Sequence, residues 1–120
     1  MRTDLNMRRG KQMAQAGHAA EAFLYANNLS KKAGVLRCEL TDKAQAWITR
    51  YKRTKIVVGV DSLGELEDLV FKAKFHGIEH HVITDAGATE FNGVPTVTCV
   101  ALGPEYVDVI NPLTGHLKLL

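Results

Sequence analysis

The chain has 120 residues, a length typical of one domain, and we expect residues 1–120 to form a single unit. Hydrophobic residues make up 46% and charged residues 23%, and no apolar run approaches the roughly 20 residues that cross a bilayer, which excludes a helical membrane protein. The net charge of +2 hides an asymmetry, because residues 1–55 hold twelve Lys or Arg against four Asp or Glu, a balance of +8, and the remainder has a balance of −6. This asymmetry indicates a polyanionic partner such as nucleic acid, unless folding mixes the two halves.

The first half of the chain predicts two helices joined by a basic loop. Met1–Leu5 is typical of the end of a strand, and the alanine-rich segment Gly10–Asn28 predicts a helix that packs closely against a sheet. Leu29–Leu40 is typical of a loop. Thr41 is a suitable N-cap for a second helix, because apolar side chains then recur at helical spacing as far as Tyr51.

A β-branched run opens the second half. Ile56–Val60 has the continuous apolar pattern of a strand that is buried on both faces. Ser62 and Glu65 form a capping box, which predicts that a helix follows. Gly77 is suited to the position just after the end of that helix.

Four further segments complete the chain. His80–Thr84 and Thr96–Leu102 predict short strands, Pro104–Ile110 predicts a short helix, and Pro112–Gly115 predicts a turn. The alternation of strands with helices predicts an α/β layer fold. In such folds ligands bind beyond the carboxyl ends of the strands, where the loops gather.

The segment Asp4–Gly10 leads from a strand to a helix and is one place to look for a site. The helix start at Gly10 and Lys11 offers unpaired backbone N–H groups and a positive dipole end, which suit an anion. Lys11, Gln15 and His18 are four and three residues apart, so they share one helix face. This polar face is either part of a site or simply exposed to water. The pattern is not that of a P-loop.

The segment Asp85–Thr89, directly after an expected strand, is the second place. The carboxylate of Asp85 at a strand end, followed by the flexible Gly87, can hold a water molecule or a substrate hydroxyl. The alternative is a turn in which Asp85 accepts hydrogen bonds from its own downstream amides.

Several other chemistries are excluded by the residue pattern. His80 and His81 are adjacent in an expected strand and point to opposite faces, and there is no HExxH or Cys/His cluster, so we expect no metal site. No GxGxxG dinucleotide signature and no serine nucleophile elbow is present. Cys38 and Cys99 form no CxxC pair, so the alternatives are a single disulfide and two reduced thiols in a cytosolic protein, and the second is favoured. The basic amino terminus has no apolar stretch behind it, so we expect no secretory signal.

Three ordered blocks resemble the type 2 peptidyl-tRNA hydrolases. The blocks are Arg2-Thr3-Asp4-Leu5-Asn6-Met7 with Gly10-Lys11, Ala14-Gln15 and His18-Ala19; Asp85-Ala86-Gly87 with Thr89; and Gly103-Pro104 with Thr114-Gly115-His116-Leu117-Lys118-Leu119. Their order and spacing span nearly the whole chain. A single Asp-Ala-Gly would mean little, whereas three ordered blocks are specific.

The resemblance implies an α/β fold as a single compact domain, with a mixed four-stranded sheet flanked by helices on both faces. It also implies a cytoplasmic homodimer that cleaves the ester of peptidyl-tRNA without a metal or organic cofactor. The implied catalytic residues are Lys11, His18, Asp85 and Thr89. The implied substrate-binding residues are Asp4, Met7, Arg8, Arg9, Gly10, Gln15, Gly87 and Thr96.

The chain departs from the family beside Thr89. Ala88 and Glu90 stand where the family commonly has Arg and Gln, and the charge of Glu90 would repel a phosphate-rich substrate. Arg8, Arg9 or the basic loop at Lys31-Lys32 could compensate for this charge.

Two alternative functions remain. One is a non-catalytic RNA-binding or interaction module with the same fold, and the other is an α/β domain that acts on another small ester. The resemblance further implies that a few residues of the first strand precede Met1.

Overall fold

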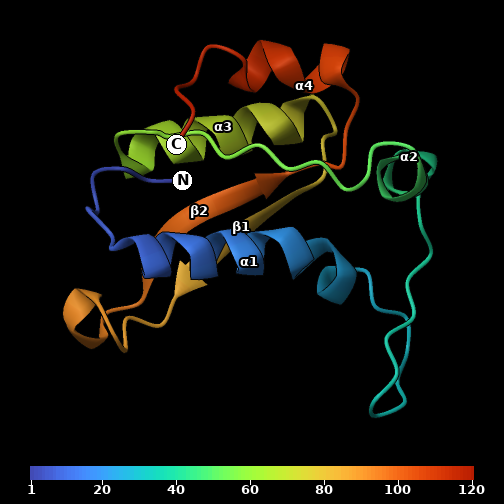
Figure 1. Cartoon of the computed structure of the whole chain (residues 1–120), viewed down its shortest axis with the longest axis horizontal. Coiled ribbons are helices and arrows are strands. Elements are labelled where there is room, and N and C mark those ends of the chain that lie inside the picture. Colours follow the sequence, from blue (N-terminus) through green and yellow to red (C-terminus); the bar gives the residue numbers. More distant parts are fainter.

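A two-stranded antiparallel ribbon lies between the helices α1 and α3 in the computed structural model, which describes residues 1–120 and contains four α-helices (Figure 1). The elements in chain order are α1 (Arg9–Ala26), α2 (Asp42–Thr49), α3 (Leu63–Phe75), β1 (His80–Asp85), η1 (Phe91–Gly93), β2 (Thr96–Leu102) and α4 (Val107–Thr114). In Figure 1, α1 lies below the ribbon, α3 lies above it, and α4 packs on the outer side of α3. α2 lies near the C-terminal end of α1.

The mixed four-stranded sheet expected from the sequence is wrong. The sheet has two strands, β1 and β2, and they are antiparallel. Met1–Leu5 and Ile56–Val60, which were expected to be strands, are irregular apart from single bridges. The Arg2 amide still donates to the Thr98 carbonyl at 2.9 Å, so the first of these segments lies along β2.

The β-branched run is paired on both sides, but each pairing is too short to form a regular strand. The Val60 amide donates to the Met1 carbonyl at 2.9 Å, whereas the adjacent Gly59 amide donates to the Lys118 carbonyl at 2.8 Å. The Met1 amino group also donates to the Val58 carbonyl and the Thr3 amide to the Val60 carbonyl, both at 2.8 Å, but each pairing spans only a few residues and leaves a single bridge. The run is not buried on both faces either, because Ile56 is 72% exposed. Strand propensity reflects local burial and packing, which the sequence run alone does not determine.

The helix ends follow the capping residues. Thr41 accepts a hydrogen bond from the Ala44 amide at 3.2 Å, as expected for the N-cap of α2. Ser62 accepts one from the Glu65 amide at 3.1 Å, which confirms the N-cap of α3. Gly77 adopts a φ of +65° just past that helix, a conformation that favours glycine.

The last helix lies further along the chain than the sequence predicted. α4 begins at Val107, not at Pro104, and continues through Pro112 to Thr114, so the expected turn at Pro112–Gly115 is wrong. Proline lacks the amide hydrogen that this position would donate within the helix. The Thr114 hydroxyl donates to the Ile110 carbonyl at 3.2 Å and adds a contact to this last turn.

Buried apolar side chains form three small clusters. Their members are Met1, Met7 and Cys99 on the α1 side; Val60, Leu66 and Leu69 on the α3 side; and Ala73, Ile78 and Leu113 between α3 and α4. α1 and α3 therefore hold the ribbon from opposite faces. None of the helices combines the length and the apolarity that spanning a bilayer would require.

A β-bulge interrupts the ribbon near the carboxyl end of β1. Ile83 pairs with Cys99, but the next residue, Thr84, pairs with Val97, so Thr98 is an extra residue on β2. Bulges commonly re-aim side chains beside functional sites. Here the side chains of two consecutive residues, Thr98 and Cys99, both contact Gln15 of α1.

Candidate active site

The first turn of α1 and the end of β1 meet in one ion pair. The Lys11 ammonium lies 2.7 Å from Oδ2 of Asp85, and each side chain is only 12% exposed. The two residues are 74 positions apart in sequence. The fold thus brings together the two segments in which the sequence predicted a site.

Asp85 receives three hydrogen bonds. Its Oδ2 also accepts from the Gln15 side-chain amide at 2.8 Å, and its Oδ1 accepts from the Gly87 backbone amide at 2.8 Å. The bond from Gly87 forms the turn that the sequence offered as the alternative to a functional site. The turn and the ion pair with Lys11 are therefore both present. The Lys11 ammonium first, and then the Gly87 amide, hold the pKa of the Asp85 carboxyl below its ordinary value. Asp85 is therefore a carboxylate at neutral pH.

The Asp85 turn depends on a glycine. Gly87 has a φ of +81°, and a Cβ at this position would lie 2.4 Å from the Val94 carbonyl oxygen. The Gly87 carbonyl accepts a hydrogen bond from the Gly93 amide at 2.9 Å, which fixes the loop from the other side. Any side chain here would have to displace this backbone.

Buried polar groups behind the pair set its orientation. Gln15 is 1% exposed and Thr98 is fully buried. The Thr98 hydroxyl donates to Gln15 Oε1 at 2.6 Å, so the amide nitrogen of Gln15 faces Asp85. A chain of contacts thus runs from Thr98 through Gln15 to Asp85 and on to Lys11. Buried polar side chains of this kind need partners, and each one here has them.

Sequence reasoning missed Thr98 and chose Thr96 instead. The Thr96 hydroxyl donates to the Val94 carbonyl at 2.9 Å and takes no part in the Asp85 network. A polar residue inside the apolar run Thr96–Leu102 was the available signal, because a threonine there needs a buried partner. The bulge that turns Thr98 toward α1 leaves no such signal in the sequence.

An open groove of about 480 Å³ lies beside the ion pair. The residues that line it are Arg8, Gly10, Lys11, Ala14, Thr89 and Glu90. Four of the predicted site residues are among them. The Thr89 side chain is exposed and forms no hydrogen bond with the protein, so its hydroxyl is available to a ligand.

A second ion pair crosses the rim of this groove. Arg8 Nε lies 2.7 Å from Glu90 Oε1, and Arg8 is 77% exposed whereas Glu90 is 16% exposed. The charge that seemed unfavourable in the sequence is thus balanced by a residue of the same groove. Because exposed ion pairs contribute little, a stronger anion can draw Arg8 away from Glu90.

The other predicted site residues lie apart from the pair. His18 is exposed on α1 and makes no hydrogen bond, and Arg9 is exposed without an acidic partner. Asp4 forms a salt bridge with Arg2 at 2.7 Å. Met7 is buried in the α1 cluster, where only its carbonyl is engaged, by a hydrogen bond from Gln12. Their roles in binding or catalysis stay predictions.

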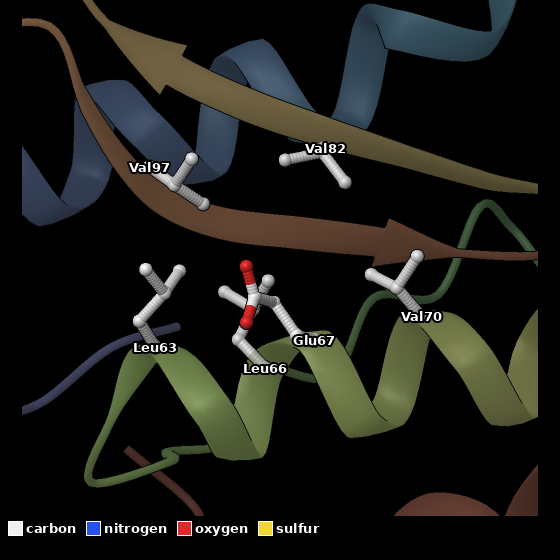
Figure 2. Close-up of a pocket in the computed structure, with 6 residues that line it drawn as sticks. All are labelled: Leu63, Leu66, Glu67, Val70, Val82 and Val97. Carbon is white, nitrogen blue, oxygen red and sulfur yellow. The ribbon is translucent and has the colours of Figure 1, made fainter.

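A second hollow, of about 230 Å³, lies on the other face of the ribbon (Figure 2). It is lined by Leu63, Leu66, Glu67, Val70, Val82 and Val97, between α3 and the strands. Five of these six side chains are hydrophobic, and Glu67 is the only ionisable group among them. The hollow has no nucleophile and no paired acid and base, so the groove at Lys11 is the better candidate for chemistry.

Comparison with known proteins decides which family these features represent. The family described as "Peptidyl-tRNA hydrolase PTH2" matches residues 1–120. The chain belongs to this family.

Named relatives of the same family come from archaea. A protein of Methanocaldococcus jannaschii named peptidyl-tRNA hydrolase is 41% identical over 121 residues, which covers 100% of this chain and 95% of the relative. Proteins with the same name from Metallosphaera sedula and Methanothermobacter thermautotrophicus are 38% and 34% identical, again over 100% of this chain and 95% of each relative. The match is therefore to whole proteins of this family and not to a fragment of larger ones.

Replacing Thr98 with Val tests the buried support of the site. The change keeps the shape but leaves Gln15 Oε1 without a donor, so we expect the free energy of unfolding to fall by about 1–3 kcal/mol in denaturant titrations. Thr98→Ser, which keeps the hydroxyl, is the matched control and should lose less. Equal stability of Thr98→Val and the unchanged chain would show that the contact chain contributes nothing.

Proposed function

We propose that the chain is a cytoplasmic peptidyl-tRNA hydrolase whose active centre is the Lys11–Asp85 pair. The reaction is the hydrolysis of the ester between a peptide carboxyl group and a ribose hydroxyl of tRNA. The observation that carries the proposal is that a family member places a nearly enclosed lysine at the wall of an open groove and pairs it with an aspartate behind that wall. The cytoplasmic assignment is supported by Cys38 and Cys99, which are both free thiols.

Lys11 supplies the positive charge for the reaction. Its ammonium is held by Asp85 at the start of α1, where unpaired backbone N–H groups add to the positive potential. An oxyanion that develops on the ester carbonyl is stabilised by donors fixed in advance in this way. The Phe91 ring, whose centroid lies 6.0 Å from the ammonium, limits the directions from which the ester approaches.

Asp85 orients groups and is a weak base. A carboxylate whose pKa is lowered holds a proton poorly, and general bases work best when their pKa lies near the working pH. Asp85 therefore positions Lys11 and accepts a hydrogen bond from the attacking water, and the water's proton ends on the departing ribose oxygen. Thr89, at the groove wall, holds that water or the neighbouring ribose hydroxyl.

His18 contributes at a distance from Asp85. It follows Lys11 by seven residues, which is about 10 Å along a helix axis. The donors to Asp85 are Lys11, Gln15 and Gly87, so His18 is not needed to orient the carboxylate. We assign it to contact with the substrate further along the exposed face of α1.

The alternative function, an RNA-binding module without turnover, rests on Ala88 and Glu90. Glu90 is neutralised by Arg8, and the lysine, aspartate and threonine of the expected catalytic set are all retained beside the groove. These contacts favour the enzyme. A peptidyl-tRNA hydrolysis assay separates the two functions, because a binding module would retain tRNA without releasing peptide.

Replacing Asp85 with Asn tests the active centre. The amide is nearly isosteric but loses the charge that holds Lys11, so kcat on peptidyl-tRNA should fall by about 10²–10³-fold in a variant that still folds but is less stable. Asp108→Asn removes an exposed carboxylate of α4 and serves as the control with the same change in charge. Turnover of Asp85→Asn within twofold of the control is the outcome that removes Asp85 from the mechanism.

Replacing Glu90 with Gln tests the rim of the groove. The change frees Arg8 for substrate phosphate, so we expect tRNA to bind roughly two- to fivefold more tightly. The slope of log Kd against log salt should steepen by about 0.9, the value for one added phosphate contact. Asp68→Asn, which releases Lys72 from an exposed salt bridge on α3, is the matched control. The interpretation fails if both variants gain affinity equally.

We further propose a homodimer formed through the α3 side of the molecule. Phe71 and Phe75 are one helical turn apart on α3 and are 67% and 79% exposed, and Leu63 opens onto the apolar hollow. Exposed apolar surface of this kind is typical of protein interfaces. Sedimentation equilibrium should give twice the chain mass of 13.2 kDa. The Phe71→Glu variant should sediment as a monomer. If the unchanged chain is itself a monomer at all concentrations, the proposal is contradicted.

A further inference from the structure

Residues 50–55, which follow α2, form a cationic turn that the active centre does not use. We call it the basic turn, and its charged residues are Arg50, Lys52, Arg53 and Lys55. All four are exposed, and none forms a salt bridge. The chain holds no acidic residue between Asp42 and Asp61, so the positive charge of the turn is not offset by its neighbours in sequence.

The backbone of the basic turn is fixed in an uncommon conformation. Lys52 and Arg53 have φ values of +49° and +58°, although neither is glycine. This conformation is unfavourable for residues with a side chain and persists where the surrounding structure holds it, often at functional positions. The Arg53 amide donates to the Trp47 carbonyl at 2.9 Å, and the Trp47 indole donates to the Thr54 carbonyl at 2.7 Å. The turn therefore holds neighbouring cationic side chains on a backbone that is fixed by hydrogen bonds to and from Trp47.

The same tryptophan joins the basic turn to the helix that carries Lys11. The Trp47 ring packs edge-on against Phe23 of α1, with ring centroids 5.6 Å apart, and Phe23 is 7% exposed. Phe23 follows Lys11 by twelve residues, which is about 18 Å along the helix axis. Figure 1 shows α2 near one end of α1 and the η1 loop, beside the groove, near the other. α1 therefore acts as a spacer between the groove and the basic turn.

A ligand that contacts both the groove and the basic turn must be long, and it must carry negative charge far from the ester that lies in the groove. A free peptidyl ester is too short, whereas a structured RNA whose 3′ end lies in the groove has phosphates at the required separation. We propose that the basic turn binds the phosphate backbone of the base-paired part of the tRNA while its ester end occupies the Lys11–Asp85 groove. The inference rests on the proposed function. The contact is with phosphate and shape, so it carries no base specificity.

The test compares two substrates in a charge-neutralised variant. The variant is Arg50→Gln, Lys52→Gln and Arg53→Gln together, with Lys55 kept because its ammonium packs over the Trp47 ring at 5.1 Å. The substrates are full-length peptidyl-tRNA and the same peptidyl group on a CCA trinucleotide. We expect KM for peptidyl-tRNA to rise on the order of tenfold, as for three exposed charge contacts, with kcat retained. The trinucleotide should be hydrolysed as by the unchanged chain.

The matched control neutralises three exposed lysines that lie outside α1, α2 and the basic turn, namely Lys72, Lys74 and Lys118. It lowers the net charge by the same amount and should leave both substrates unaffected. The slope of log Kd for tRNA against log salt should fall by about two to three in the test variant and remain unchanged in the control. Circular dichroism and thermal unfolding verify that both variants are folded.

Three outcomes overturn the inference. Equal losses in the test and control variants would show a general effect of net charge. An equal loss of activity on peptidyl-tRNA and on the trinucleotide would show that the basic turn acts on the reaction in the groove and not on the body of the tRNA. Unchanged peptidyl-tRNA kinetics combined with lost binding to phosphatidylserine vesicles would assign the turn to a membrane surface. If the unchanged chain hydrolyses neither substrate, the proposed function fails. The slope of log Kd for tRNA against log salt then still tests whether the basic turn binds phosphate.

Discussion

The geometry of the groove depends on one ion pair between segments that are distant in sequence. Lys11 on α1 and Asp85 at the end of β1 are both mostly enclosed, and a charge in that position is costly unless it is paired and its remaining hydrogen-bonding capacity is used. The pair forms only if α1 lies on the ribbon in one orientation. The same interaction therefore fixes the register of the helix on the sheet and places the Lys11 ammonium at the groove.

Some groups around the Lys11–Asp85 pair are held rigidly by their neighbours, whereas those at the rim of the groove are free to move. Gly87 donates to Asp85 from a turn that tolerates no side chain, and Gln15 is held from behind by Thr98, which the bulge turns inward. Arg8 and Glu90 at the rim are far more accessible, so their pair can open to a substrate phosphate. A rigid centre with a labile rim suits an enzyme that must position one ester and then release a large polyanion.

Local signals in the sequence located α1, α2, α3 and the strands β1 and β2, but neither the number of strands in the sheet nor the bounds of α4. Capping by Thr41 and Ser62 involves residues three positions apart, so such ends can be read directly from the sequence. The run at Ile56–Val60 has strand propensity, but its pairing with the two neighbouring segments is limited to single bridges, and only the tertiary structure determines how far such pairing extends. The segment Asp85–Thr89 could be found from its position after a strand. A threonine inside an apolar run signalled that Thr98 needs a buried partner, but that this partner is Gln15 depends on the bulge, which leaves no signal in the sequence. The resemblance placed Lys11 and Asp85 in one site, but their ion pair depends on how α1 packs on the ribbon, which no local signal in the sequence reports.

The most direct measurement is an NMR titration of the Asp85 carboxyl carbon, in the unchanged chain and in Lys11→Met. A lowered pKa means that the pair stabilises the fold at pH values above it, and that this contribution is lost as the pH falls through it. The predicted result is a midpoint below the ordinary aspartate value of about 3.9, which moves upward when the ammonium is removed. A midpoint at or above that value, or one that Lys11→Met leaves in place, would contradict the pairing on which the site is built.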